Sequence, residues 1–147
     1  MFARRVFLVG VVALAATPIF AGTEVYSKNG MAIEGYDPVA YFTQSKAVRG
    51  KSEFSSSYLG ATFLFSSKDN KNLFESNPKK YAPEFGGHCA WAASQGYIAK
   101  SDPRAWTVHG GKLYLNYNKS IRKKWLRNID SNIAKGDANW PSLKASL

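Results

Sequence analysis

The sequence has very few residues that hold metals or form disulfides. Its 147 residues include one cysteine, two histidines and two methionines. One cysteine excludes an intramolecular disulfide, and it excludes structural zinc sites that need two or four cysteines. The glycine-rich motifs that bind dinucleotides and nucleoside triphosphates are also missing. The sequence therefore offers few side chains that could bind a metal ion.

Acidic residues are scarce, with 10 Asp and Glu against 20 Lys and Arg, which gives a formal charge of +10. Apolar residues make up 45% of the chain, a globular composition whose length suits one domain. For an exported chain, this charge favours an acidic protein or an anionic membrane surface as the partner. We do not expect a nucleic acid as a partner.

Residues 1–21 have the features of a secretory signal peptide. Arg4 and Arg5 precede an apolar run that continues to Phe20, and a basic start before a short apolar stretch is typical of such peptides. The run is shorter than the ~20 apolar residues that span a bilayer comfortably. We expect cleavage near Ala21 and a periplasmic or secreted mature protein. The alternative is an uncleaved anchor, and the paired arginines fit the general or the twin-arginine export route.

Two pairs of β-prone segments predict antiparallel hairpins in the rest of the chain. Gly60 separates the first pair, and Gly110-Gly111 separates the second, in the manner of a two-residue turn. The paired segments are residues 52–59 with 61–65 and residues 105–109 with 112–117. We therefore expect an α+β fold, in which small antiparallel hairpins pack with short helices, over a domain at residues 30–143.

A C-terminal amphipathic helix is predicted from a cap at Asn118 to about Lys135, with Gly136 as its stop. Isoleucines and Trp125 recur every four residues and form one apolar face. Basic residues crowd its first half, at positions 119, 122, 123, 124 and 127. Two interpretations remain open for them: a solvated face, or a surface that docks an acidic partner or anionic lipid.

Cys89 stands where we expect the first turn of a short helix, after Gly86-Gly87 and His88. The N–H groups and dipole at a helix start stabilise a thiolate and lower the pKa of the thiol. Cys89 has four open interpretations: core packing, a soft-metal ligand, a catalytic thiol paired with a histidine, or a redox-active or partner-linking thiol. No spacing places an Asp or Asn to orient a catalytic pair, so the sequence favours a protein that is not an enzyme.

The candidate metal ligands are Cys89, His88 and His109. With Met31 they equal in number a copper set of two histidines, one cysteine and one methionine. Structural zinc would need a carboxylate as its fourth ligand, from Asp37 or Glu84. Copper is therefore the favoured ion. His109 also has the interpretation of a surface residue at the end of a strand, which its position favours.

The order of motifs along the chain resembles that of the YHS-domain proteins of bacteria. The matching segments are GYDPVAYF at 35–42, FLFS at 63–66, NLF at 72–74, NPKKYAP at 77–83, FGGHCA at 85–90, Gly96, DPRAW at 102–106, GKLYLNY at 111–117, Trp125 and NWP at 139–141. The resemblance implies a small α+β domain with a role in metal binding, because YHS domains occur beside proteins that handle copper and other heavy metals. It assigns that role to Cys89.

Overall fold

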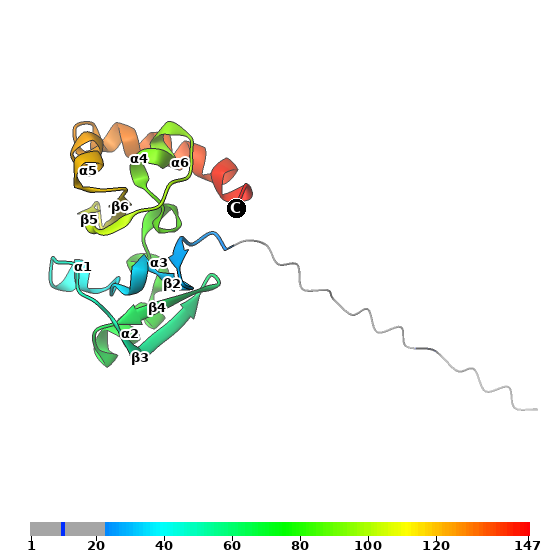
Figure 1. Ribbon diagram of the computed structural model, residues 1–147, viewed down its shortest axis with the longest axis vertical. Helices are drawn as coiled ribbons and strands as arrows, with labels where there is room; N and C mark the ends of the chain where they lie inside the picture. Colours follow the sequence, from blue (N-terminus) through cyan, green and yellow to red (C-terminus); the bar gives the residue numbers. More distant parts are fainter. Residues whose placement is uncertain (1–9, 11–22) are drawn as a thin grey trace, which may run out of the picture.

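The computed structural model describes Gly10 and residues 23–147, so the predicted signal peptide lies outside the described residues apart from Gly10. Helices and strands are mixed, and the α+β prediction is confirmed. The chain forms two lobes stacked along its longest axis, which we call the first lobe (residues 25–81) and the second lobe (residues 90–147) (Figure 1). Among the described residues, no helix is both long enough and apolar enough to span a bilayer.

The first lobe is built on a four-stranded sheet with the order β1-β2-β4-β3, in which β2 and β4 run parallel. Its strands are β1 (Ser27–Lys28), β2 (Met31–Ala32), β3 (Lys51–Tyr58) and β4 (Ala61–Phe65). The predicted hairpin around Gly60 is therefore confirmed. Leu59 and Gly60 make its turn with φ values of 50° and 81°, the left-handed geometry that suits a two-residue hairpin.

Short helices cover this sheet and join it to the second lobe. They are η1 (Ile33–Gly35), α1 (Ala40–Thr43), α2 (Lys68–Ser76) and α3 (Pro78–Tyr81). Ser67 caps α2, because its hydroxyl accepts a hydrogen bond from the Asn70 N–H at 3.1 Å. Pro78 begins the next helix, so α2 ends before it.

Asp37 is fully buried and ties the start of the domain to β4 and α2. One carboxylate oxygen accepts hydrogen bonds from the backbone of Val39 and Ala40, at 2.8 and 3.3 Å. The other accepts from the Ser66 N–H and hydroxyl and from Asn70 Nδ2, at 2.8, 2.7 and 2.7 Å. Both carboxylate oxygens of Asp37 are therefore occupied by hydrogen bonds within the fold, which argues against Asp37 as a zinc ligand.

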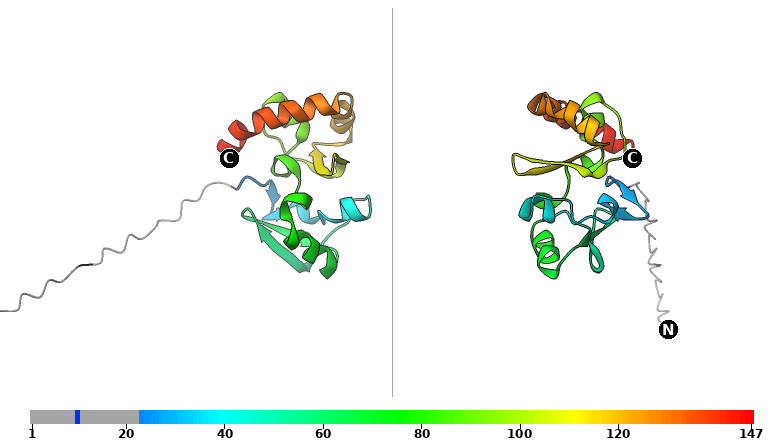
Figure 2. Two further views of the ribbon diagram at one scale, coloured as in Figure 1. Left: turned by 180° about the vertical axis from the view of Figure 1, so that it is seen from behind. Right: turned by 60° about the vertical axis from the view of Figure 1, so that its left-hand side comes forward.

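The second lobe packs a two-stranded hairpin against three helices. Its elements are α4 (Ala90–Gln95), β5 (Asp102–His109), β6 (Lys112–Asn116), α5 (Lys119–Leu126) and α6 (Ile129–Ala145), and η2 (Glu84–Gly87) leads into it. The hairpin predicted around Gly110-Gly111 is confirmed. It lies between the helices and the first lobe (Figure 2).

Strand β6 joins the two hydrophobic clusters of the core. Leu113 and Leu115 belong to the cluster that holds the phenylalanines of β4 and α2. Tyr114, between them in sequence, belongs to the cluster of Phe85 and Trp125. Successive side chains of a strand point to opposite faces, so one short strand is buried on both sides and couples the lobes.

The single helix predicted over residues 118–135 is wrong, because two helices cover that region. The cap at Asn118 is confirmed, since its side chain accepts from the Ile121 N–H at 2.8 Å. The helix breaks at Asn128, whose φ and ψ are −138° and 56°. Asn132 Nδ2 donates to the Trp125 carbonyl at 2.8 Å, which satisfies an acceptor freed by the break.

Gly136 is not the predicted stop, because α6 passes through it. It is buried, and a Cβ on it would lie 2.6 Å from Cζ of Phe85. The glycine is there because α6 approaches η2 closely at this point.

Candidate functional site

Cys89 is the N-cap residue of α4. It directly precedes the helix and does not lie in its first turn. Its backbone is extended, with φ −58° and ψ 120°, and it forms an isolated bridge with Leu115 of β6. Its N–H donates to the Ala99 carbonyl at 2.9 Å. The residue is therefore held between α4, the 96–101 loop and β6, and it is only 1% exposed.

The thiol is embedded in a hydrogen-bond network with the end of β6. Sγ accepts a hydrogen bond from the Tyr117 N–H at 3.2 Å, and the S–H donates to Asn116 Oδ1 at 3.6 Å. Burial raises the pKa of the thiol, and nearby backbone N–H groups, at Tyr117 and in the first turn of α4, lower it only in part. The predicted low-pKa thiolate is therefore wrong, because desolvation outweighs the helix start.

Cys89 nevertheless lines a small pocket of about 200 Å³. The walls are formed by Trp91, Tyr97, Tyr117 and Ile121, together with Ala99. Tyr97 and Tyr117 are exposed, at 51% and 45%. Cys89, which is 1% exposed, thus shares an apolar, aromatic pocket with two exposed tyrosine rings.

Two lysines stand over the aromatic walls of this pocket. Lys124 Nζ lies 5.0 Å from the centre of the Trp91 ring, and Lys100 Nζ lies 5.7 Å from that of Tyr117. Both distances allow cation–π attraction. We call Lys100 and Lys124 the positive rim of the Cys89 pocket.

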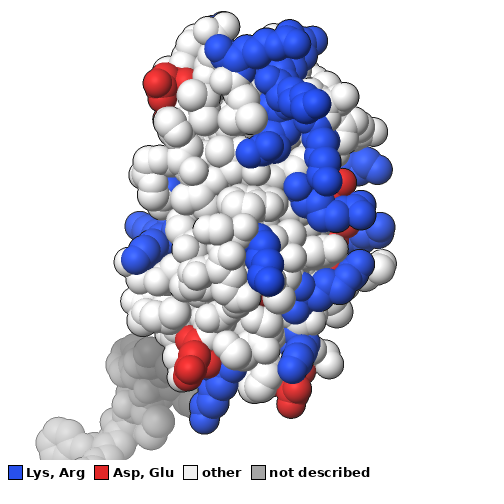
Figure 3. Space-filling model, turned by 90° about the vertical axis from the view of Figure 1, so that its left-hand side faces the viewer, with Lys and Arg blue, Asp and Glu red and all other residues white. Residues whose placement is uncertain are grey.

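This rim continues into the basic residues of α5. We call the exposed cations Lys100, Lys119, Lys123, Lys124 and Arg127 the basic face. Lys and Arg gather at the end of the molecule where α5 lies (Figure 3). Among residues 23–147, none of the ion pairs involves a cation of α5, so these charges are not neutralised within the described part of the protein.

His88 faces away from the Cys89 pocket. The backbone is extended at both residues, which turns successive side chains to opposite sides. His88 is 6% exposed, its Nε2 lies 3.1 Å from the Glu24 carbonyl, and its ring lies near Tyr26 and Trp140, with centroids 5.9 and 6.0 Å away. Burial lowers its pKa, and the hydrogen bond to the carbonyl opposes this only in part. The ring is therefore neutral at pH 7.

His109 lies at the far end of β5 and pairs with Asp130 of α6, with 3.0 Å between Nε2 and Oδ1. Its strand partner is Lys112, three residues from the bridge partner of Cys89. At ~3.3 Å a residue, this is about 10 Å along β6. Within the described residues, no three His, Cys, Asp or Glu side chains gather closely enough to hold a metal ion. Cys89, His88 and His109 therefore do not form one centre.

The sequence did not single out the aromatic walls of the pocket or Asn116 as partners of Cys89. Asn116 is fully buried, and its Oδ1 also accepts from the Trp91 N–H at 3.0 Å. Its Nδ2 has no hydrogen-bond partner among the described residues. The alternation along β6 could have indicated that Asn116 faces away from Leu115, but only the fold places it beside the thiol.

Comparison with known families finds a match over part of the chain. The model of the YHS domain matches residues 39–84, which cover α1 to α3 and the β3–β4 hairpin. The match ends five residues before Cys89. No curated protein and no solved structure matches the chain. Residues 39–84 thus match the YHS domain, in agreement with the resemblance seen in the sequence.

Proposed function

We propose that this protein is an exported accessory protein that takes up a soft metal ion as cargo at Cys89. The observation that carries the proposal is that Cys89 lines an aromatic pocket with two lysines over its aromatic residues. Thiolates select soft ions, and Cu(I) is the ion favoured here. The metal role implied by the YHS resemblance supports the same assignment.

The described residues supply one soft donor at this pocket, so the second ligand comes from the molecule that delivers the ion. A Cu(I) ion held by two donor thiolates carries a net negative charge. Lys100 and Lys124 at the rim attract such a complex. Exchange of one donor thiolate for Cys89 then moves the ion into the pocket, and the proton of the Cys89 thiol goes to the thiolate that leaves.

Competition with a Cu(I) chelator tests this function. The wild type should bind about one Cu(I) per chain, and Cys89→Ser should lose most of that affinity, because a serine hydroxyl stays protonated and is a harder ligand. His88→Phe and His109→Ala should keep it, since both rings lie away from the thiol. Wild-type affinity in Cys89→Ser would overturn the proposal, provided that circular dichroism shows both proteins folded.

A second candidate function is a metal-free interaction module that docks through the basic face. The observation that favours it is the lack of carboxylate partners for the cations of α5 within residues 23–147. Its partner would be an acidic protein or an anionic membrane surface. The buried, hydrogen-bonded thiol of Cys89 would then be a packing residue.

Charge reversal separates the two functions. Lys119→Glu, Lys123→Glu and Arg127→Glu together should abolish binding to vesicles of phosphatidylglycerol and phosphatidylcholine in equal parts, while Cys89→Ser should leave it unchanged. The reversed residues are exposed, so folding should survive. Equal binding by the triple variant at low salt would eliminate this docking surface.

Export is part of the proposal and has its own test. Cleavage near Ala21 gives a mature protein that begins at about Gly22. Sequencing the N-terminus of protein recovered from the periplasm should give this start. An intact Met1 on protein from the cytoplasm would contradict it.

A further inference from the structure

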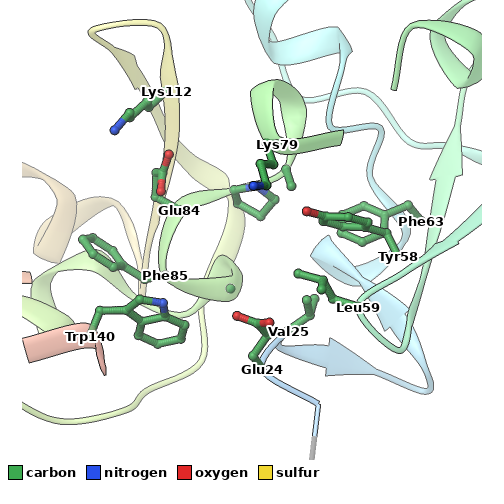
Figure 4. A pocket seen from close by; sticks show the side chains of 13 residues that line it. Glu24, Val25, Tyr58, Leu59, Phe63, Lys79, Glu84, Phe85, Lys112 and Trp140 are labelled. Carbon is green, nitrogen blue, oxygen red and sulfur yellow. The ribbon is translucent and has the colours of Figure 1, made fainter. Parts of the chain in front are cut away.

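A second cleft, of about 380 Å³, lies between the two lobes and away from Cys89. Tyr58 and Leu59 line it from the first lobe, and Phe85 and Trp140 line it from η2 and the second lobe (Figure 4). Its volume lies in the range of small-molecule sites. Leu59 is 47% exposed, so one wall is an apolar side chain left open to solvent.

Four charged side chains line the cleft. Glu84 and Lys112 lie near each other above Phe85, and Lys79 stands across from them (Figure 4). Within the described chain, none of these three groups forms an ion pair. A fourth charge, Glu24, lies 3.9 Å from Lys144, at the limit of an ion pair.

Glu84 is the most informative of these groups. It is half-buried at the start of η2, and burial raises the pKa of its carboxyl, although the charge of Lys112 opposes this. A partly desolvated carboxylate that forms no close ion pair gains from a cationic ligand. Lys112, beside it and exposed, offers the opposite charge at the mouth of the cleft.

We propose that this cleft binds a small zwitterion with an apolar body, of the hydrophobic α-amino acid class. The ligand ammonium pairs with Glu84, and the ligand carboxylate pairs with Lys112. The apolar side chain lies between Phe85 and Trp140 on one side and Leu59 on the other. This arrangement uses both signs of charge and both apolar walls, which a simple anion or cation does not. It is independent of the function proposed for Cys89.

Calorimetry of the full mature chain with L-phenylalanine tests the site. Phenethylamine and 3-phenylpropionate each lack one charge of the probe and should bind about tenfold more weakly, since each loses a charge-assisted contact. Glu84→Gln and Lys112→Gln should each weaken phenylalanine binding by about the same factor. Lys46→Gln, an exposed residue of the first lobe outside the cleft, is the matched control and should bind as the wild type does.

Nuclear magnetic resonance locates the ligand. Phenylalanine should shift the indole N–H signal of Trp140, and it should do so in Cys89→Ser as well. No binding to the wild type overturns the proposal, as does equal binding of all three probes. A shift of the Trp91 signal without that of Trp140 would also overturn it, because the ligand would then occupy the Cys89 pocket.

Discussion

The Tyr117 N–H donates a hydrogen bond to Sγ of Cys89 at 3.2 Å. This contact ties the end of β6 to the residue that caps α4, and both residues line the aromatic pocket. This hydrogen bond stabilises the thiolate form of Cys89, but burial has the stronger effect and keeps the thiol protonated at neutral pH. Any ion that binds Cys89 must therefore displace a proton.

The first prediction is a pH dependence of Cu(I) binding. Release of one proton per ion makes the apparent affinity rise about tenfold per pH unit below the pKa of the thiol. Because burial raises that pKa above its ordinary value of 9.0, the rise should continue from pH 6 to beyond pH 9. Competition titrations with a chelator of known pH dependence measure it. A plateau that begins near pH 7 would mean that the ion does not displace the proton of a buried thiol.

The second prediction concerns His88 and acid stability. Its pKa is below 6.5 in the folded protein because it is buried, so the unfolded chain takes up the proton first as the pH falls. Stability should therefore decrease from pH 7 through 6.5 toward the lower folded pKa, with the unfolding constant rising by up to about tenfold per pH unit. Urea denaturation at several pH values measures this slope.

His88→Phe should flatten that slope, because it removes the group that takes up the proton. An unchanged slope in His88→Phe would show that another group controls stability in this range.

The third prediction concerns Asp37. Asp37→Asn places an amide NH₂ among buried donors, so at least one hydrogen bond is lost and one donor is left unpaired. We expect a loss of about 3 kcal/mol in the free energy of unfolding. Asp69→Asn, an exposed residue in the first turn of α2, should lose less than about 1 kcal/mol. Equal losses in the two variants would argue against the Asp37 network.

The fourth prediction concerns Gly136. Gly136→Ala improves helix propensity by about 1 kcal/mol, but its Cβ would overlap the Phe85 ring. Such overpacking typically costs about 1–3 kcal/mol, so the variant should be less stable, with a lower Tm. Ser131→Ala, on an exposed position of α6, is the control and should not lower Tm. A stabilised Gly136→Ala would show that α6 does not approach η2 this closely.

Local signals predicted much of the fold. Gly60 and Gly110-Gly111 marked both hairpins, and Asn118 marked a helix start, because turns and caps depend on neighbouring residues. The role of Gly136 depends on its close contacts with the Phe85 ring, which is distant in sequence. No local pattern contains those contacts.

The candidate site was predicted less well for the same reason. Composition identified Cys89, His88 and His109 as donors, but it could not show that extended backbone turns His88 away from Cys89. Composition also could not show whether burial or the helix start has the larger effect on the pKa of the Cys89 thiol. The pocket walls come from α4, the 96–101 loop, β6 and α5, and only their packing brings them together.

Native mass spectrometry after incubation with a Cu(I)–glutathione complex tests the central claim most directly. The wild type should gain the mass of one copper ion, and Lys100→Glu combined with Lys124→Glu should gain it more slowly, because the rim then repels the anionic complex. Cys89→Ser should gain none while keeping the charge states of a folded protein. Copper on Cys89→Ser at the wild-type level, or no copper on the wild type, would contradict a soft-metal site at Cys89.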